Sequence, residues 1–192
     1  MRTKELKAIW LVYTNPAQSM PNLNTVHDGL SNAEFVVVQE AYAHTATTLY
    51  ADILLPATTL AEKIGTVTNS ERRISQVNPA IKLYASSKHD WQIALEVARA
   101  LEELLRDNKM NGVSTLCSDC GPEDIWNEHR ESTSGRDLDN TSLSYQILEE
   151  GGPQQWSMPN RNCFGKKRLY KNGVFPTKDK RLTLLQHHIR QL

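Results

Sequence analysis

Three short apolar runs, each ended by polar or turn-forming residues, constrain the fold of this chain more than any other feature. The runs are Ala8–Tyr13, Phe35–Val38 and Asp52–Leu55, and they do not alternate apolar with polar residues. A short continuous apolar run is typical of a strand that is buried on both faces. The segments between the runs, Asn24–Leu30 and His44–Tyr50, can each form a short helix. Strands alternating with helices in this way predict a parallel sheet with right-handed crossover connections.

The clearest helix lies downstream of the predicted sheet, between Lys88 and Leu105. Its apolar residues recur at helical spacing and form one face, made of Trp91, Ala94, Leu95, Ala98, Leu101 and Leu105. Two further segments, Pro122–Glu131 and Ser144–Glu150, can form short helices between stretches rich in Ser, Thr, Asn, Asp and Gly. We therefore predict an α/β fold with a parallel Rossmann-like sheet and flanking helices, followed by a loop-rich segment.

The charge balance excludes function classes that depend on a strong net charge. The chain has 22 Lys and Arg against 22 Asp and Glu, so no net field attracts it to nucleic acid or to a membrane surface. No apolar run approaches the ~20 residues that span a bilayer, and residues 1–7 lack the apolar stretch of a secretory signal. Three cysteines cannot all pair, which disfavours a disulfide framework and favours a reducing compartment. We expect a cytoplasmic protein that binds neither nucleic acid nor membrane.

Polar residues gather where the three predicted strands end. Asn15 follows the first strand, Gln39 and Glu40 end the second, and the pair Glu62–Lys63 lies in the loop after the third. Ligands of open parallel sheets bind outside the carboxyl ends of the strands. Carboxylates can accept hydrogen bonds from ribose hydroxyls or guanine N–H groups, an Asn amide both donates and accepts, and a Lys can neutralise phosphate. Together these residues look like half of a dinucleotide site, although the glycine-rich phosphate loop of ordinary NAD and FAD sites is absent.

Each of these residues also has a purely structural interpretation. Asn15 precedes a proline and can simply form a turn, and Glu40 can be a solvated loop acid. The pair Glu62–Lys63 can be a surface ion pair worth ~0–1 kcal/mol. Asp90, near the start of the predicted long helix, can be an acid that the helix dipole favours. Glu71–Arg73 can be a salt-bridged loop, and we assign it a structural role.

The cysteine spacing indicates a metal site only weakly. Cys117 and Cys120 have the spacing of a metal half-site, but a closed zinc or iron–sulfur site needs four ligands. Cys163 and His129 are the remaining candidates, and their spacing fits no strong pattern. We predict no metal-ligating residue in this chain.

Several stretches spread over about residues 5–177 carry a family pattern that is specific in combination. They are Ile9–Ala17, Val36–Tyr42, Ala51–Pro56, Glu62–Ile74, Lys88–Trp91, Glu128–His129, Gly135–Asp139 and Gly152–Trp156. The combination resembles the molybdopterin oxidoreductase superfamily and, within it, the assimilatory nitrate reductase catalytic subunit. The forms of Gly65–Arg73 and Pro153–Trp156 favour the nitrate reductase branch over formate dehydrogenase.

The resemblance implies an activity, a cofactor and a set of binding residues. Family members bind two molybdopterin guanine dinucleotides around one molybdenum, pass electrons through an iron–sulfur cluster and reduce nitrate to nitrite. By this resemblance Asn15 contacts the dinucleotide from the first loop, while Gln39 and Glu40 hold its nucleotide end. Lys63 lies against the pterin or phosphate, and Asp90 hydrogen-bonds the nucleotide edge.

The resemblance also implies that this chain is a part of a larger enzyme. Family members are several times longer, and their cluster cysteines and molybdenum-ligating cysteine belong to segments that this chain lacks. We expect residues 1–150 to be a partial molybdopterin-dinucleotide-binding domain. Residues 151–192 are expected to be a linker and the truncated start of a β-rich C-terminal dinucleotide-binding domain that acts as a cap. The expected partner is the remainder of the oxidoreductase subunit or an electron-donor protein.

Two other functions stay open beside this one. The chain can be a module that binds a nucleotide without chemistry, or a decayed fragment without activity. We expect no catalytic residue in the chain, and no nitrate reduction by the chain alone. The iron–sulfur cluster is expected only in the N-terminal part of the family enzyme.

Overall fold

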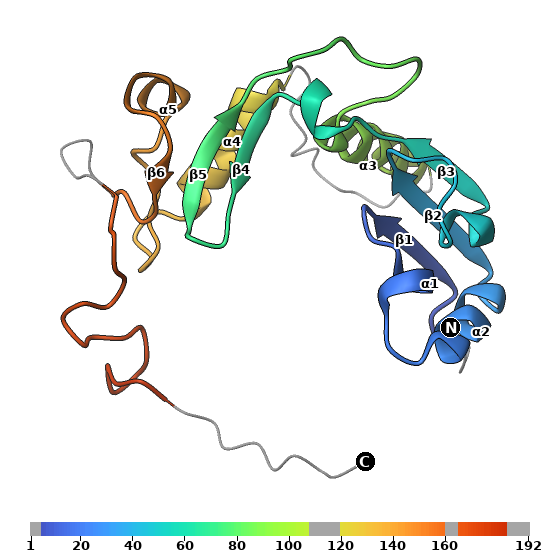
Figure 1. Ribbon diagram of the computed structural model, residues 1–192, viewed down its shortest axis with the longest axis horizontal. Helices are drawn as coiled ribbons and strands as arrows, with labels where there is room; N and C mark the ends of the chain where they lie inside the picture. Colours follow the sequence, from blue (N-terminus) through green and yellow to red (C-terminus); the bar gives the residue numbers. More distant parts are fainter. Residues whose placement is uncertain (1–4, 108–119, 160–164, 184–192) are drawn as a thin grey trace. The chain divides into compact units, whose positions relative to one another are not determined.

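The computed structural model describes residues 5–107, 120–159 and 165–183 (Figure 1). The chain divides into two compact units. Unit 1 consists of residues 1–64 and 78–119, and unit 2 of residues 65–77 and 120–192. The predicted boundary between residues 150 and 151 separates two cofactor-binding domains and not two compact units, and it stays a prediction.

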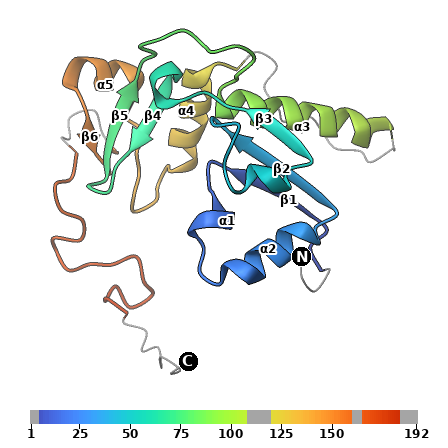
Figure 2. The same cartoon turned by 45° about the vertical axis from the view of Figure 1, so that its right-hand side comes forward.

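Unit 1 is built on a three-stranded parallel sheet in the order β1-β2-β3. The strands are β1 at Ala8–Val12, β2 at Phe35–Glu40 and β3 at Ile53–Pro56. They lie side by side in both views of the ribbon (Figures 1 and 2). The predicted α/β fold with a parallel sheet is confirmed, because both strand pairs are parallel.

Two helices, α1 (Pro16–Ser19) and α2 (Leu23–Ser31), pack on one face of this sheet. The core between them and the sheet is apolar, and its buried members are Ala17, Leu30, Val36 and Val38. The helix expected at His44–Tyr50 shrinks to a single 3-10 turn, η1 (Thr48–Tyr50). The hydroxyls of Thr45 and Thr48 accept hydrogen bonds from each other's backbone N–H groups at 2.9 and 3.2 Å and hold a turn at residues 45–48.

The expectation that all three strands are buried on both faces is wrong for β1 and β3. Only β2 is largely buried, whereas most residues of β1 and β3 are exposed or half-buried. In β2 the buried side chains Val36 and Val38 lie on the face that packs against α1 and α2, whereas Phe35 on its other face is exposed.

The predicted long helix is α3 (Asp90–Asp107), which begins two residues later than expected. A 3-10 turn, η2 (Leu60–Glu62), and the loop after it precede α3 in unit 1. Ile93 in the first turn of α3 is buried, but Leu101 and Leu104 are exposed. The apolar face of α3 is therefore covered near its start and uncovered further along.

Unit 2 contains an antiparallel sheet that the sequence analysis missed. β4 (Gly65–Thr68) pairs with β5 (Arg73–Val77), and β5 pairs with the short β6 (Gln154–Gln155). The missed signal is two β-prone segments separated by the turn residues Asn69 and Ser70, which is typical of a hairpin. The segment Glu71–Arg73, interpreted as a salt-bridged loop, is the end of a hairpin turn and the start of β5, and Glu71 and Arg73 form an ion pair at 3.9 Å.

Two predicted helices of unit 2 are confirmed as α4 (Pro122–Ser132) and α5 (Tyr145–Gly151). They pack with the sheet around a core whose buried members are Ile74, Trp126, Leu143, Tyr145, Leu148 and Met158. The Trp126 indole N–H donates a 2.8 Å hydrogen bond to the carbonyl of Leu143, which satisfies the one polar atom of that ring. Within the described ranges, no helix has the length and apolarity needed to cross a membrane.

The centre of the unit 2 core offers a direct test of this packing. Leu143 is completely buried, so Leu143→Ala should lower the free energy of unfolding by about 2–5 kcal/mol through lost burial and a residual cavity. Leu182→Ala, at an exposed position of the same unit, should have little effect. Urea unfolding followed by circular dichroism measures both, and an equal loss in the two variants would contradict the assigned core.

Candidate functional site

A cluster of polar side chains forms at the carboxyl ends of the unit 1 strands. Its members are Tyr13, Gln39, Lys63 and Asp90, and we call it the Lys63 cluster. Tyr13 directly follows β1, Gln39 lies near the end of β2, Lys63 follows η2, and Asp90 is the first residue of α3. Four separate segments of the chain thus bring one polar side chain each to this end of the sheet, where ligands of parallel sheets bind.

Asp90 is the centre of the cluster, because it has a partner on each carboxylate oxygen. The Lys63 ammonium lies 2.5 Å from Asp90 Oδ2. The Gln39 amide donates a 2.8 Å hydrogen bond to Asp90 Oδ1. Lys63 Nζ also lies 4.1 Å from the centre of the Tyr13 ring, within the range of a cation–π contact. The side chains of Lys63 and Asp90 keep about a quarter and a third of their surface exposed, so a ligand can reach both.

The backbone at Tyr13 turns the chain sharply away from β1. Its φ angle is 53°, in the left-handed region that residues other than glycine seldom occupy. The Tyr13 hydroxyl donates a hydrogen bond to the backbone carbonyl of the buried Thr58, and its N–H donates to the carbonyl of Gln39 at 3.0 Å. Residues held in such backbone conformations by their surroundings cluster at functional sites. Tyr13 was not among the predicted site residues; its only sequence signal is an aromatic ring at the end of a strand.

The charges of the cluster shift the protonation of Lys63 and Tyr13. Burial lowers the pKa of the Lys63 ammonium, but its hydrogen bonds to Asp90 and Tyr13 outweigh burial and raise the pKa above the ordinary value of 10.5. Burial raises the pKa of Tyr13, and the charges of Asp90 and Glu40 add to this rise, while the hydrogen bond to Lys63 opposes it. At neutral pH Lys63 is therefore a cation beside a neutral tyrosine.

The structure brings three of the five predicted binding residues together, and Asn15 is not one of them. Asn15 Oδ1 accepts hydrogen bonds from the backbone N–H and the hydroxyl of Thr47, at 3.0 and 2.5 Å. Its amide donates to Gln18 Oε1 at 2.7 Å. Asn15 thus ties the loop after β1 to the segment before η1, which fits a structural role.

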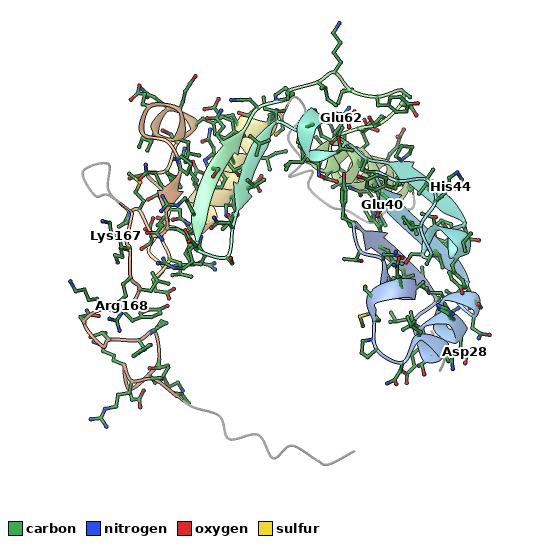
Figure 3. All side chains as sticks on the ribbon, in the orientation of Figure 1. Asp28, Glu40, His44, Glu62, Lys167 and Arg168 are labelled. Atoms are coloured by element: carbon green, nitrogen blue, oxygen red, sulfur yellow. The ribbon has the colours of Figure 1, made fainter. Side chains whose placement is uncertain are left out.

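Glu40 is buried, so its interpretation as a solvated loop acid is wrong. Its Oε1 accepts hydrogen bonds from the backbone N–H groups of Ala41 at 2.7 Å and Tyr42 at 3.3 Å. Glu40 also lines a mostly apolar cavity of about 460 Å³, together with Leu54 and Pro56 at the end of β3. Figure 3 shows its place at the end of β2.

Glu62 does not form the expected surface pair with Lys63. It is buried, and its Oε2 accepts hydrogen bonds from the N–H and hydroxyl of Thr59 at 2.7 and 2.8 Å. Its Oε1 accepts a 2.6 Å hydrogen bond from the N–H of Tyr84. The hydrogen bonds from Thr59 lower the pKa of Glu62. This carboxylate holds the η2 turn and the loop at residue 84 together, and leaves Lys63 free to pair with Asp90.

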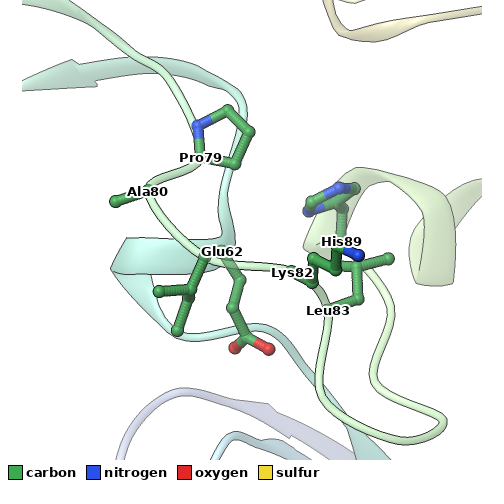
Figure 4. A pocket seen from close by; sticks show the side chains of 7 residues that line it. Glu62, Pro79, Ala80, Lys82, Leu83 and His89 are labelled. Atoms are coloured by element: carbon green, nitrogen blue, oxygen red, sulfur yellow. The ribbon is translucent and has the colours of Figure 1, made fainter.

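A second hollow of about 640 Å³ lies beside Glu62 and is lined by the loop at residues 79–83 and by His89 (Figure 4). Neither hollow is lined by Lys63, Gln39 or Asp90. We place the candidate site at the Lys63 cluster, because charge and hydrogen-bonding groups converge there, whereas the hollows are open and mostly apolar.

The described residues contain no group of three or more His, Cys, Asp and Glu side chains arranged to hold a metal ion. Cys120 is disulfide-bonded, which does not fit the expectation of a reducing compartment. Cys117 and Cys163, the other members of the weak metal pattern, lie outside the described residues.

Sequence comparisons show which known proteins the chain is similar to. The sequence model of the family "Molybdopterin oxidoreductase" matches residues 1–100. Over its whole length the chain is 34% identical to the nitrate reductase of Synechocystis sp., of which it covers 26%. The assimilatory nitrate reductase catalytic subunit of Bacillus subtilis is 34% identical over 86% of the chain, which covers 22% of that protein. The F420-dependent formate dehydrogenase subunit alpha of Methanocaldococcus jannaschii is 32% identical over 88% of the chain, which covers 23% of it.

The chain belongs to the molybdopterin oxidoreductase family. The family resemblance and its nitrate reductase character are confirmed, and formate dehydrogenases are also among the relatives. The chain spans about a quarter of the length of the curated relatives it matches.

The raised pKa of Lys63 depends on Asp90, so Asp90→Asn should lower it. Removing the carboxylate removes the hydrogen-bonded charge that outweighs burial. A titration of the lysine side-chain signals by NMR measures the shift. Glu96→Gln is the control, because Glu96 pairs with Lys88 at 2.5 Å and should leave the pKa of Lys63 unchanged. An unchanged Lys63 pKa in Asp90→Asn would rule out the assigned pair.

The same shift predicts the pH dependence of stability. Because the folded-state pKa of Lys63 is raised above 10.5, its stabilisation is fully present below pH 10.5 and is lost as pH rises through the folded-state value. Lys63→Met should therefore lower the free energy of unfolding by at most about 1 kcal/mol at neutral pH, and by less as the pH exceeds 10.5. A difference between wild type and variant that grows above pH 10.5 would contradict this sign.

Proposed function

We propose that this chain supplies part of the site that binds a molybdopterin guanine dinucleotide in a nitrate reductase-like oxidoreductase. The observation that carries the proposal is the Lys63 cluster, in which Lys63, Asp90 and Gln39 converge at the carboxyl ends of a parallel sheet. The family implies a molybdenum–pterin cofactor, and the donor set of the cluster fits the polar, anionic end of such a molecule.

Lys63 fits a phosphate contact. An ammonium carries three N–H donors; that of Lys63 pairs with Asp90 and lies over the Tyr13 ring. About a quarter of the Lys63 side chain is exposed, so a ligand can reach it. A phosphate oxygen accepts such a charge-assisted hydrogen bond, and the raised pKa keeps Lys63 charged over the whole physiological range.

Asp90 fits a contact to the nucleotide edge. Each of its carboxylate oxygens has one protein partner, and each oxygen has a second lone pair that can accept an N–H of a base or a ribose hydroxyl. Gln39 is almost fully buried, so we assign it the role of orienting Asp90. Asp90 is also the acid at the start of α3 that the helix dipole favours. The two roles do not compete, because one carboxylate serves both.

We assign Glu40 a direct contact with the ligand and Asn15 a mainly structural role. Both described hydrogen bonds of Glu40 go to Oε1, so Oε2 remains for a ligand in the neighbouring cavity of about 460 Å³. Asn15 is engaged with Thr47 and Gln18, and we propose that it shapes the loop and reaches the cofactor only through its remaining amide hydrogen.

The bound cofactor would supply the redox chemistry, and the residues of this chain would bind and orient it. Two nitrate reductase relatives support the reduction of nitrate to nitrite as the activity of the whole enzyme. The formate dehydrogenase relatives make formate oxidation the second candidate, supported by 32% identity over 88% of the chain. In either case we assign the iron–sulfur cluster and the molybdenum ligand to polypeptide outside this chain, and electrons to a separate donor or acceptor protein. Cytoplasmic localisation stays a prediction.

Titration with GMP tests the proposed nucleotide contact. GMP carries both the guanine edge and a phosphate, so we expect binding at millimolar concentration by the wild-type chain. Lys63→Met and Asp90→Asn should each weaken it about tenfold, equivalent to about 1.4 kcal/mol. The change is followed by isothermal calorimetry or by NMR shifts.

Lys88→Met is the matched control, because the Lys88 ammonium pairs with Glu96, whereas that of Lys63 pairs with Asp90. GMP affinity should not change in this variant. No response of the wild type to millimolar GMP, or an equal loss in Lys88→Met and Lys63→Met, would rule out the assigned contact.

A further inference from the structure

Tyr13 is held at both ends by backbone carbonyls from other parts of the sheet. Its N–H donates a 3.0 Å hydrogen bond to the carbonyl of Gln39 in β2. Its hydroxyl donates to the carbonyl of Thr58, two residues after β3. Because Tyr13 itself directly follows β1, this one residue joins the ends of all three strands, and its ring is fixed between them.

The residue that accepts the Tyr13 hydroxyl bond is itself held in place. Thr58 is completely buried, and its N–H donates to the carbonyl of Lys88 at 3.1 Å. The N–H of Lys88 in turn donates to the carbonyl of Pro56 at 3.1 Å. These bonds tie the end of β3 to the chain two residues before Asp90. The same backbone contacts therefore position both partners of the Lys63 ammonium, the Tyr13 ring and the Asp90 carboxylate.

The backbone conformation of Tyr13 is unfavourable for a residue with a side chain. Its φ angle is 53°, a value that glycine adopts at the lowest cost. A residue stays in such a conformation only where its surroundings fix it, as the bonds to Gln39 and Thr58 do here. A glycine would make the same turn, but it could not place a ring 4.1 Å from Lys63 Nζ. The feature that the tyrosine adds at this position is its contact with Lys63.

We propose that Tyr13 is the positioning residue of the phosphate contact, because its ring holds the Lys63 ammonium where the phosphate binds. A lysine side chain has many rotamers, and a binding site in which it is loose must order it when the ligand binds. A partly exposed ion pair orders such a side chain only weakly, so the Asp90 contact alone leaves it mobile. The ring supplies a second contact from a fixed direction. This inference rests on the proposed contact between Lys63 and a phosphate.

Two substitutions of Tyr13 separate the ring from the hydroxyl. Tyr13→Leu removes both, and it should weaken GMP binding about fivefold, because Lys63 must then be ordered by the ligand. Tyr13→Phe keeps the ring below the ammonium and loses only the bond to Thr58, so its affinity should stay within about twofold of wild type. NMR gives a signature of the contact itself. The ring should shift the ε-methylene protons of Lys63 upfield in the wild type and in Tyr13→Phe, but not in Tyr13→Leu.

A double variant tests whether Tyr13 acts through Lys63. In a Lys63→Met background, Tyr13→Leu should change GMP affinity by less than about twofold, because the ammonium that the ring positions is already gone. NMR titration up to tens of millimolar GMP measures both backgrounds. Tyr42→Leu is the control, because it removes a tyrosine side chain of unit 1 that is 68% exposed. It should leave GMP affinity unchanged.

The outcomes distinguish this inference from the proposed function. An equal loss of GMP affinity from Tyr13→Leu in both backgrounds would make Tyr13 a structural residue and overturn the inference. A Tyr13→Phe variant that binds as weakly as Tyr13→Leu would overturn the role of the ring. If Lys63→Met weakens GMP binding while Tyr13→Leu does not, the inference fails alone. If the wild type does not respond to GMP, the inference and the proposed function fail together.

Discussion

The ion pair between Lys63 and Asp90 is the interaction that organises the polar side chains at the strand ends of unit 1. It joins the loop after η2 to the start of α3, while Gln39 links the same carboxylate to the end of β2. Tyr13 adds the end of β1 through its contact with the Lys63 ammonium. A polar network that is satisfied within the protein holds its members in fixed positions. The geometry of the strand ends is therefore set by the same side chains that are available to a ligand.

The two buried carboxylates around this network, Glu62 and Glu40, have different roles. Glu62 is fully engaged by Thr59 and Tyr84, and it fixes the turn from which Lys63 projects. Glu40 is half engaged by its own loop. A carboxylate whose oxygens are all satisfied stabilises a loop, whereas one with remaining acceptor capacity can also serve a ligand. This difference separates the supporting residues from those assigned to the cofactor.

The sequence predicts the parallel sheet of unit 1 well, because apolar runs and turn residues are local signals. The rule about strand ends predicted Gln39 and Lys63 at one site, and the family resemblance added Asp90; the structure brings the three together. Tyr13 was missed, because its contact with Thr58 joins residues 45 positions apart and leaves no local pattern. The buried role of Glu62 was missed for the same reason, since its partner Tyr84 lies 22 residues away. Contacts between distant segments decide which polar residue is structural, and the periodicity of the sequence does not predict these contacts.

A parallel sheet with polar residues at the carboxyl ends of its strands is what a cofactor-binding part of a larger oxidoreductase needs. The central claim is that this chain itself contacts the dinucleotide, and mass spectrometry of cofactor retained by the chain tests it most directly. The chain would be purified from a host that makes molybdopterin guanine dinucleotide, beside the Lys63→Met variant. The account predicts that the wild-type chain retains the dinucleotide and that the variant retains about tenfold less. Retention at the same background level in both proteins would contradict it.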